Sequence, residues 1–131
     1  MSSLFQTDKH RVQLYMAENA DWMKTIVAQA DEIPTLKKML NDGNMDEEND
    51  KSVIENELFN KELSSQQEEM TKLNAALYQQ QERLKTDTAR KYLYDIDSLC
   101  SQDILRDRIK EIEKKYIELK CSFMKFLASK I

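Results

Sequence analysis

The chain has 131 residues, a formal net charge of −4, and only one glycine and one proline. Average composition would place about fifteen of these two residues in a chain of this length, so folds that need tight turns, β-bulges or glycine-rich phosphate loops are disfavoured. The modest charge, with both signs interspersed, excludes the uniformly basic surface of nucleic-acid-binding proteins. The many Glu, Lys, Gln, Leu and Met residues instead predict an all-α protein.

Hydropathy and cysteine usage indicate the cellular setting. No apolar run reaches the ~20 residues that span a bilayer, and residues 1–14 are too polar for a secretory signal. We therefore expect a soluble intracellular protein, cytoplasmic or nuclear, without an integral membrane segment. Cys100 and Cys121 lack metal-ligand spacing and are expected to be reduced thiols. Cys121 should face solvent, because it lies off the apolar row described below.

Residues 1–43 are predicted to form an N-terminal helical segment, capped by Thr7 or Asp8. Neighbouring apolar residues widen its apolar row, which is typical of a helix packed among several others. The row consists of Val12, Met16, Met23, Ile26, Ala30 and Ile33, with Asn19 as a polar interruption. Trp22 is the only tryptophan. It is either part of the packed core or an anchor at the centre of an interface.

Two breaks are expected near the end of this segment. Pro34 should interrupt the helix at Ile33, because proline removes a backbone donor and disfavours helical geometry in the residue before it. Gly43 can then end the helix in the left-handed conformation. Residues 44–51 form an acidic linker and predict a domain boundary. A calcium loop is disfavoured there, because Asn49 stands where such a loop needs glycine.

Residues 52–131 are predicted to form a coiled-coil arm, which Ser52 and Glu55 start as a capping box. Its apolar residues fall in two rows with an average spacing of 3.5 residues. The first row comprises Phe59, Leu63, Met70, Leu73, Leu77 and Leu84, with Gln66 and Gln80 at inward positions. The second row comprises Leu105, Ile109, Ile112, Tyr116, Leu119, Phe123 and Phe126. Inward polar residues of this kind cost stability but can fix register and partner number.

The two rows are out of phase, which predicts an interruption between them. Residues 86–88 interrupt the first row, while Ser101 and Asp103 are good caps for a last helix. Either place could hold a hairpin, or only a stutter that locally unwinds a supercoil. A bend or short loop near Ser101 to Asp103 is preferred, and the choice between one long helix and a hairpin stays open.

Rows this regular need other helices to cover them, and we expect partner chains to supply these helices. The predicted fold is thus a set of elongated helices in a coiled coil or bundle with other chains. The partner-binding residues are those of the two rows from Leu63 to Phe126, with Gln66 and Gln80 setting the register. In a parallel homodimer Lys115 would face Lys120 of the second copy, so the flanking charges favour a hetero-oligomer.

No group of residues predicts catalysis. His10 is the only histidine and lies between Lys9 and Arg11, without cysteines or carboxylates at ligand spacing. Asp95 and Asp97 are two residues apart, so on a helix they point to different faces. We expect no enzyme activity, no cofactor and no bound metal.

In composition the chain resembles the small coiled-coil subunits of eukaryotic cytoskeletal, kinetochore, ciliary and vesicle-tethering complexes. This resemblance of class implies a non-enzymatic structural subunit that acts by helix packing, with a cytoskeletal or chromosome-segregation role slightly preferred. One alternative is a self-contained helical bundle that presents Trp22 or the C-terminal aromatics to one partner. Another is a membrane-peripheral tether that uses the apolar residues 123–127.

Overall fold

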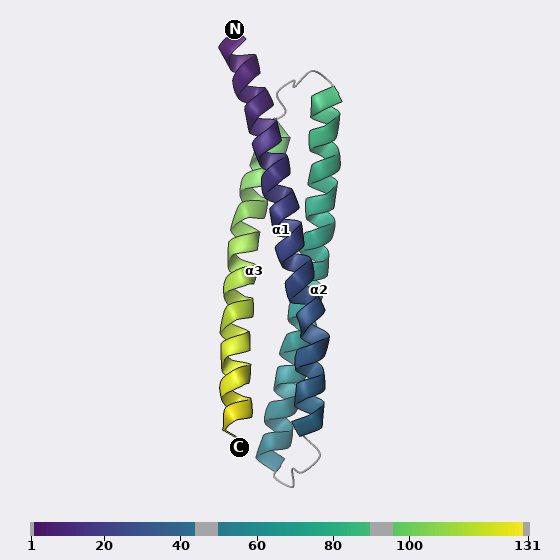
Figure 1. Cartoon of the computed structure of the whole chain (residues 1–131), viewed down its shortest axis with the longest axis vertical. Helices are drawn as coiled ribbons and strands as arrows, with labels where there is room; N and C mark the ends of the chain where they lie inside the picture. Colours follow the sequence, from purple (N-terminus) through teal and green to yellow (C-terminus); the bar gives the residue numbers. More distant parts are fainter. Residues whose placement is uncertain (1, 44–49, 90–95, 130–131) are drawn as a thin grey trace.

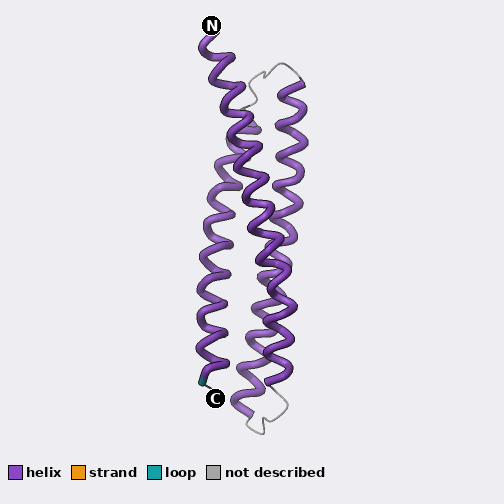
Figure 2. Tube along the Cα trace, viewed as in Figure 1, coloured by secondary structure: helices purple, strands orange, loops and turns teal. Residues whose placement is uncertain are grey.

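The computed structural model describes residues 2–43, 50–89 and 96–129. These residues form three helices: α1 (Ser2–Gly43), α2 (Asp50–Ala89) and α3 (Ile96–Ala128). Figure 1 shows the helices side by side in a rod, with the chain reversing direction after α1 and again after α2. The trace in Figure 2 is helical throughout the described part, apart from a short turn near the C-terminus. The all-α prediction is thereby confirmed for the part of the chain that the structure describes.

The helices differ in length and in how closely they pack. At one end of the rod α1 extends beyond both α2 and α3 (Figure 1). The contact between α1 and α2 is the most extensive, that between α2 and α3 is smaller, and that between α1 and α3 is the smallest. Long polar side chains bridge α1 and α3, as in the bonds of Arg106 to Glu18 and of Tyr116 to Glu32.

The predicted arm folds back on itself. Residues 50–89 and 96–128 are two antiparallel helices rather than one long helix. The preferred break near Ser101 to Asp103 is wrong, because these residues lie inside α3. The alternative at 86–88 also lies within a helix, just before the end of α2. The apolar rows are out of phase because they belong to different helices that face each other across the core.

Pro34 does not break α1, which continues through it to Gly43. Tertiary packing overrides the local penalty: Ile33 is fully buried, Leu36 is 3% exposed, and both anchor the helix on either side of the proline. Pro34 itself is exposed, so its ring meets solvent on the outer face. Two helices begin earlier in the sequence than predicted. Helix α1 begins at Ser2 rather than after Thr7 or Asp8, and α2 begins at Asp50 rather than at Ser52. Of the predicted linker 44–51, residues 44–49 lie outside the described residues, and Asp50 and Lys51 belong to α2.

One apolar core runs along the rod, and all three helices contribute to it. Its buried members are Ile26, Ile33, Leu36, Leu40, Leu63, Met70, Leu73, Leu77, Leu105, Ile109, Ile112, Tyr116 and Phe123. At one end Phe59 packs edge-on against Phe123, with ring centroids 5.7 Å apart, and lies 5.0 Å from the ring of Phe126. The rows of α2 and α3 thus cover each other within a single chain.

Candidate functional site

The residues predicted to bind partner chains lie in this intramolecular core. Leu63, Met70, Leu73, Leu77, Leu84, Leu105, Ile109, Ile112, Tyr116 and Phe123 are buried, and Leu119 and Phe126 are partly buried against them. The sequence analysis assigned helices of partner chains to cover these rows, and in the described structure helices of the same chain cover them. The physical reason is the reversal between α2 and α3, which brings the two rows face to face. Any surface for other chains must lie on the outer positions of the helices.

Trp22 also makes its contacts within the chain. It packs partly buried against the core, and the Arg106 guanidinium carbon lies 5.9 Å from its ring centroid. The same guanidinium lies 5.8 Å from the ring of Tyr15. A cation within about 6 Å of an aromatic ring is favourably placed over its negative face. Trp22 therefore helps to hold α3 against α1.

A buried polar layer crosses the core at the level of Asn19, Gln80 and Gln102, with one residue from each helix. The Gln102 amide donates to Asn19 Oδ1 at 2.9 Å, and Gln102 Oε1 accepts from Asn19 at 3.2 Å and from Gln80 at 3.2 Å. The three residues are at most 2% exposed. Because an unpaired buried amide costs about 1–3 kcal/mol, the layer favours the one alignment of the three helices in which these partners meet.

Polar side chains at the edge of the bundle extend the layer. Arg106 donates to both carboxylate oxygens of Glu18, at 3.2 and 2.7 Å, and also to Asp103 at 2.8 Å. The Glu18 hydrogen bond is the largest cause that raises the pKa of Arg106 above its usual value. Gln81 accepts from Asn19 and donates to the carbonyl oxygen of Met16 at 3.0 Å. The layer thus joins all three helices laterally.

The predicted register residues are two of the five buried polar residues in the described part of the chain, the others being Asn19, Asn56 and Gln102. Gln66 and Gln80 are buried as expected, and Gln66 donates to the carbonyl oxygen of Ile112 at 3.0 Å. Asn19 was noted only as an interruption, and Gln102 was missed. The signal for Gln102 was its spacing, because it lies three residues before Leu105 and continues the second row in the N-terminal direction.

A second polar contact ties α1 to α3 lower in the rod. The Tyr116 hydroxyl donates to Glu32 Oε1 at 2.5 Å, and Lys120 Nζ lies 2.5 Å from the same oxygen. The hydrogen bonds from Lys120 and Tyr116 hold the pKa of Glu32 below its ordinary value. Burial and the neighbouring carboxylate raise the pKa of Tyr116. The outer edge between α1 and α3 is therefore charged and internally paired.

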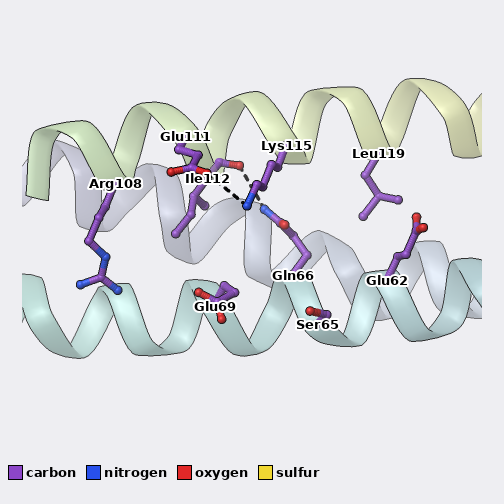
Figure 3. Close-up of a pocket in the computed structure, with 9 residues that line it drawn as sticks. All are labelled: Glu62, Ser65, Gln66, Glu69, Arg108, Glu111, Ile112, Lys115 and Leu119. Atoms are coloured by element: carbon purple, nitrogen blue, oxygen red, sulfur yellow. Dashed lines mark hydrogen bonds and ion pairs between the residues drawn. The ribbon is translucent and has the colours of Figure 1, made fainter.

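The outer edge between α2 and α3 holds a groove of about 360 Å³ (Figure 3). Ile112 and Leu119 contribute apolar surface, and Arg108 and Glu62 lie near opposite ends. The remaining lining residues are Ser65, Gln66, Glu69, Glu111 and Lys115. Lys115 pairs with Glu111 at 3.3 Å. Charged side chains thus dominate this edge as well.

The outer edge between α1 and α2 differs from the other two. Two contacts place its flanking positions side by side: Gln81 donates to the Met16 carbonyl, and Lys37 donates to Ser64 Oγ at 2.6 Å. Between these contacts every flanking position is uncharged and at least partly exposed. We call these positions the α1/α2 seam: Met16, Ala20, Met23, Val27, Ala30 and Pro34 from α1, with Ser64, Gln67, Thr71, Asn74, Tyr78 and Gln81 from α2. The charged Lys37 borders the seam at one end, where it bonds to Ser64.

The seam is unusual for this chain, in which 34% of residues are charged. Helix positions that face solvent normally carry most of that charge. Interface centres, by contrast, are depleted in charge and enriched in methionine and aromatic residues, and the seam holds Met16, Met23 and Tyr78. It is the candidate functional site of the described structure. The sequence alone does not reveal the seam, because its two sides lie in different helices and meet only when these helices pair.

The described residues contain no group of three or more His, Cys, Asp or Glu side chains placed to hold a metal ion. Cys121 is exposed, as its position off the apolar row predicted. Among the helices within the described ranges, none is long and apolar enough to cross a membrane. The chain shows no significant similarity to a protein-family model, to a curated protein or to a solved structure.

Proposed function

We propose that the protein is a non-enzymatic structural subunit that joins a larger helical assembly through the α1/α2 seam. The uncharged seam carries this proposal. It is a strip along two adjacent helices, it extends over ~30 Å at 1.5 Å per residue, and it is bordered by charged residues such as Lys24, Lys37 and Glu68. A charge-poor centre with a charged rim is the usual anatomy of a protein interface.

The proposal changes the mechanism expected from the sequence. The chain covers its own apolar rows, so it acts as a preformed bundle that binds through an outer face rather than as an open arm completed by partners. This combines the predicted structural subunit with the self-contained bundle that the sequence left as an alternative. The argument from flanking charges against self-pairing no longer applies, because it concerned rows that lie in the core.

We propose that this subunit belongs to a cytoskeletal or chromosome-segregation assembly, in the cytoplasm or nucleus. Helical partner chains suit such a seam, because a rigid strip of two parallel ridges accepts a helix or a second helix pair by ridge-into-groove packing. Preformed binding also avoids the ordering cost that a disordered arm would incur on association.

Affinity purification with quantitative mass spectrometry tests the proposal when it compares two matched variants. Val27→Glu places a charge in the seam, and Ile117→Glu places one on the outer face of α3, at a residue that is similarly exposed. We expect the wild type and Ile117→Glu to retain the same helical structural proteins, and Val27→Glu to lose them. Equal retention by all three proteins, or the absence of any specific helical partner, would overturn the proposal.

A further inference from the structure

The chemistry of the α1/α2 seam indicates what covers it. Its α1 side is apolar, with Met16, Ala20, Met23, Val27 and Ala30. Its α2 side consists of amide and hydroxyl groups, apart from the ring of Tyr78: Ser64, Gln67, Thr71, Asn74 and Gln81. We propose that the seam is the interface between two antiparallel copies of this chain. The inference rests on the proposed function and names the first partner that the seam would bind.

Self-complementarity is the reason for choosing a second copy. A two-fold axis across the rod places α1 on α1 and α2 on α2, with the two rods antiparallel. Apolar surface then meets apolar surface, which is favourable by burial. Amides and hydroxyls of one copy meet amides and hydroxyls of the other, and side chains such as Asn74 and Gln67 carry both donors and acceptors. Gln81 and Ser64 are already bonded within the chain. No like charges oppose each other at any seam position.

The alternative two-fold axis, along the rod, is disfavoured by the same chemistry. It would place the apolar α1 side of one copy on the amide side of α2 in the other. Amide groups would then be desolvated against methyl and methylene groups without hydrogen-bond partners, at about 1–3 kcal/mol for each group. The seam therefore selects the antiparallel arrangement.

The other two edges of the bundle are less suited to a second copy. Between α1 and α3, the ion pairs Glu18–Arg106 and Glu32–Lys120 already satisfy the charges within the chain. Between α2 and α3, the groove is lined by five charged side chains, which would lose water on association. The seam itself holds no charged residue between its end contacts, so a second copy that covers it desolvates charge only at its borders, at residues such as Lys24 and Lys37.

The size of the seam fits a modest dimer. Its length of ~30 Å and the ~20 Å width of two adjacent helices, with the charged borders of the seam included, give roughly 600 Å² per copy. Two copies would bury about 1,200 Å² in total, which is the lower end of the range for specific interfaces. We therefore expect a dimer with a dissociation constant in the micromolar range rather than an obligate dimer.

Sedimentation equilibrium of the full chain tests the proposal. At about 50 µM, well above the dissociation constants expected for an interface of this size, the wild type should have the mass of a dimer. Val27→Glu and Thr71→Glu should each weaken dimerisation at least about tenfold, and the control Ile117→Glu should not. A monomeric wild type, or an equal effect of Ile117→Glu, would overturn the proposal. Unchanged helix content by circular dichroism shows that each variant folds.

Disulfide trapping tests the orientation. In a Cys100→Ser, Cys121→Ser background, chains with Met23→Cys are mixed with chains that carry Ala30→Cys and then oxidised. An axis at the middle of the seam, near Val27, brings Met23 of one copy to Ala30 of the other, so the mixed disulfide should predominate. A Gln13→Cys chain with the same Ala30→Cys partner should not crosslink. Absence of the mixed disulfide, or equal trapping of Gln13→Cys, would overturn the antiparallel arrangement.

The two proposals fail in different ways. If the wild type is monomeric but loses helical partners on Val27→Glu, the second copy is wrong and the seam binds another chain. If the wild type dimerises through the seam but retains no other protein, the dimer stands and the role as a subunit of a larger assembly fails.

Discussion

Asn19, Gln80 and Gln102 show how uncharged polar side chains are accommodated in an apolar core. Each comes from a different helix, and Gln102 bonds to both of the others. A sliding register would separate these groups and leave them buried without partners, whereas leucines would tolerate several alignments. The layer thus exchanges some stability for a unique arrangement, the role best attested for polar residues in helical cores.

Gln102→Leu should destabilise the chain by about 1–3 kcal/mol, because Asn19 and Gln80 lose buried hydrogen bonds. Replacing all three residues by leucine should recover that loss or exceed it, since no buried amide is then left unpaired at this level. Urea unfolding followed by circular dichroism measures both. A single variant as stable as the wild type would show that the layer contributes nothing to the fold.

Glu32 predicts a pH dependence of stability. Its folded-state pKa lies below the ordinary value of 4.5, so its contribution is fully present above about pH 4.5 and is lost as pH falls through the folded-state pKa. Glu32→Gln should therefore lower stability at neutral pH by less than about 1 kcal/mol, because the pair with Lys120 is partly exposed. The difference from wild type should vanish in acid. Unfolding curves at several pH values decide this, and a difference that grows in acid would contradict the account.

At the scale of the helix, α1 contains its strongest local helix breaker and still continues. Pro34 lacks a backbone donor, yet the buried residues Ile33 and Leu36 tie both flanks to the core. Packing likewise decides which helix covers the apolar rows of α2 and α3. Each is an ordinary amphipathic pattern, and the partner that each row finds is the other row.

Pro34→Ala should stabilise the protein, because it restores a backbone hydrogen bond on an exposed face. The interior penalty of proline against alanine is about 3 kcal/mol, and a gain of roughly 1–3 kcal/mol is expected, since the helix is already adjusted to the ring. Thermal unfolding provides the measurement. A loss of stability would indicate that the proline shapes α1 for its packing.

Phe123 and Met124 are adjacent in α3 but face opposite environments. Phe123 is fully buried against Phe59, and Met124 is 43% exposed. Phe123→Ala should cost about 3–5 kcal/mol, whereas Met124→Ala should change stability by less than about 0.5 kcal/mol. Denaturant unfolding of the two variants compares a core position with a surface position. Equal effects would mean that the rows do not pack as described.

At the scale of the whole molecule, the sequence predicted the helices well and their arrangement poorly. The 3.5-residue rows identified the buried faces of α2 and α3, and Gln66 and Gln80 were correctly placed inward. Periodicity reports which face of a helix is covered, but not by which helix. A covering helix from the same chain and one from a partner leave the same pattern, so the rows were assigned to partner chains.

The candidate site was hidden for a related reason. The seam draws Met16, Met23 and Val27 from one helix and Thr71 and Asn74 from another. Neither set is notable alone, since a few uncharged outer positions occur on many helices. Only the antiparallel pairing of α1 and α2 shows that they form one continuous uncharged strip.

Small-angle X-ray scattering tests most directly whether the chain closes its own core. The bundle is about as long as its longest helix, α1, which has 42 residues, and at 1.5 Å per residue its maximum dimension should be roughly 65–75 Å. The antiparallel dimer has nearly the same length, because its axis lies near the middle of the rod. An arm that waits for partner chains would instead extend beyond about 120 Å as one helix. A maximum dimension of that size would contradict the account.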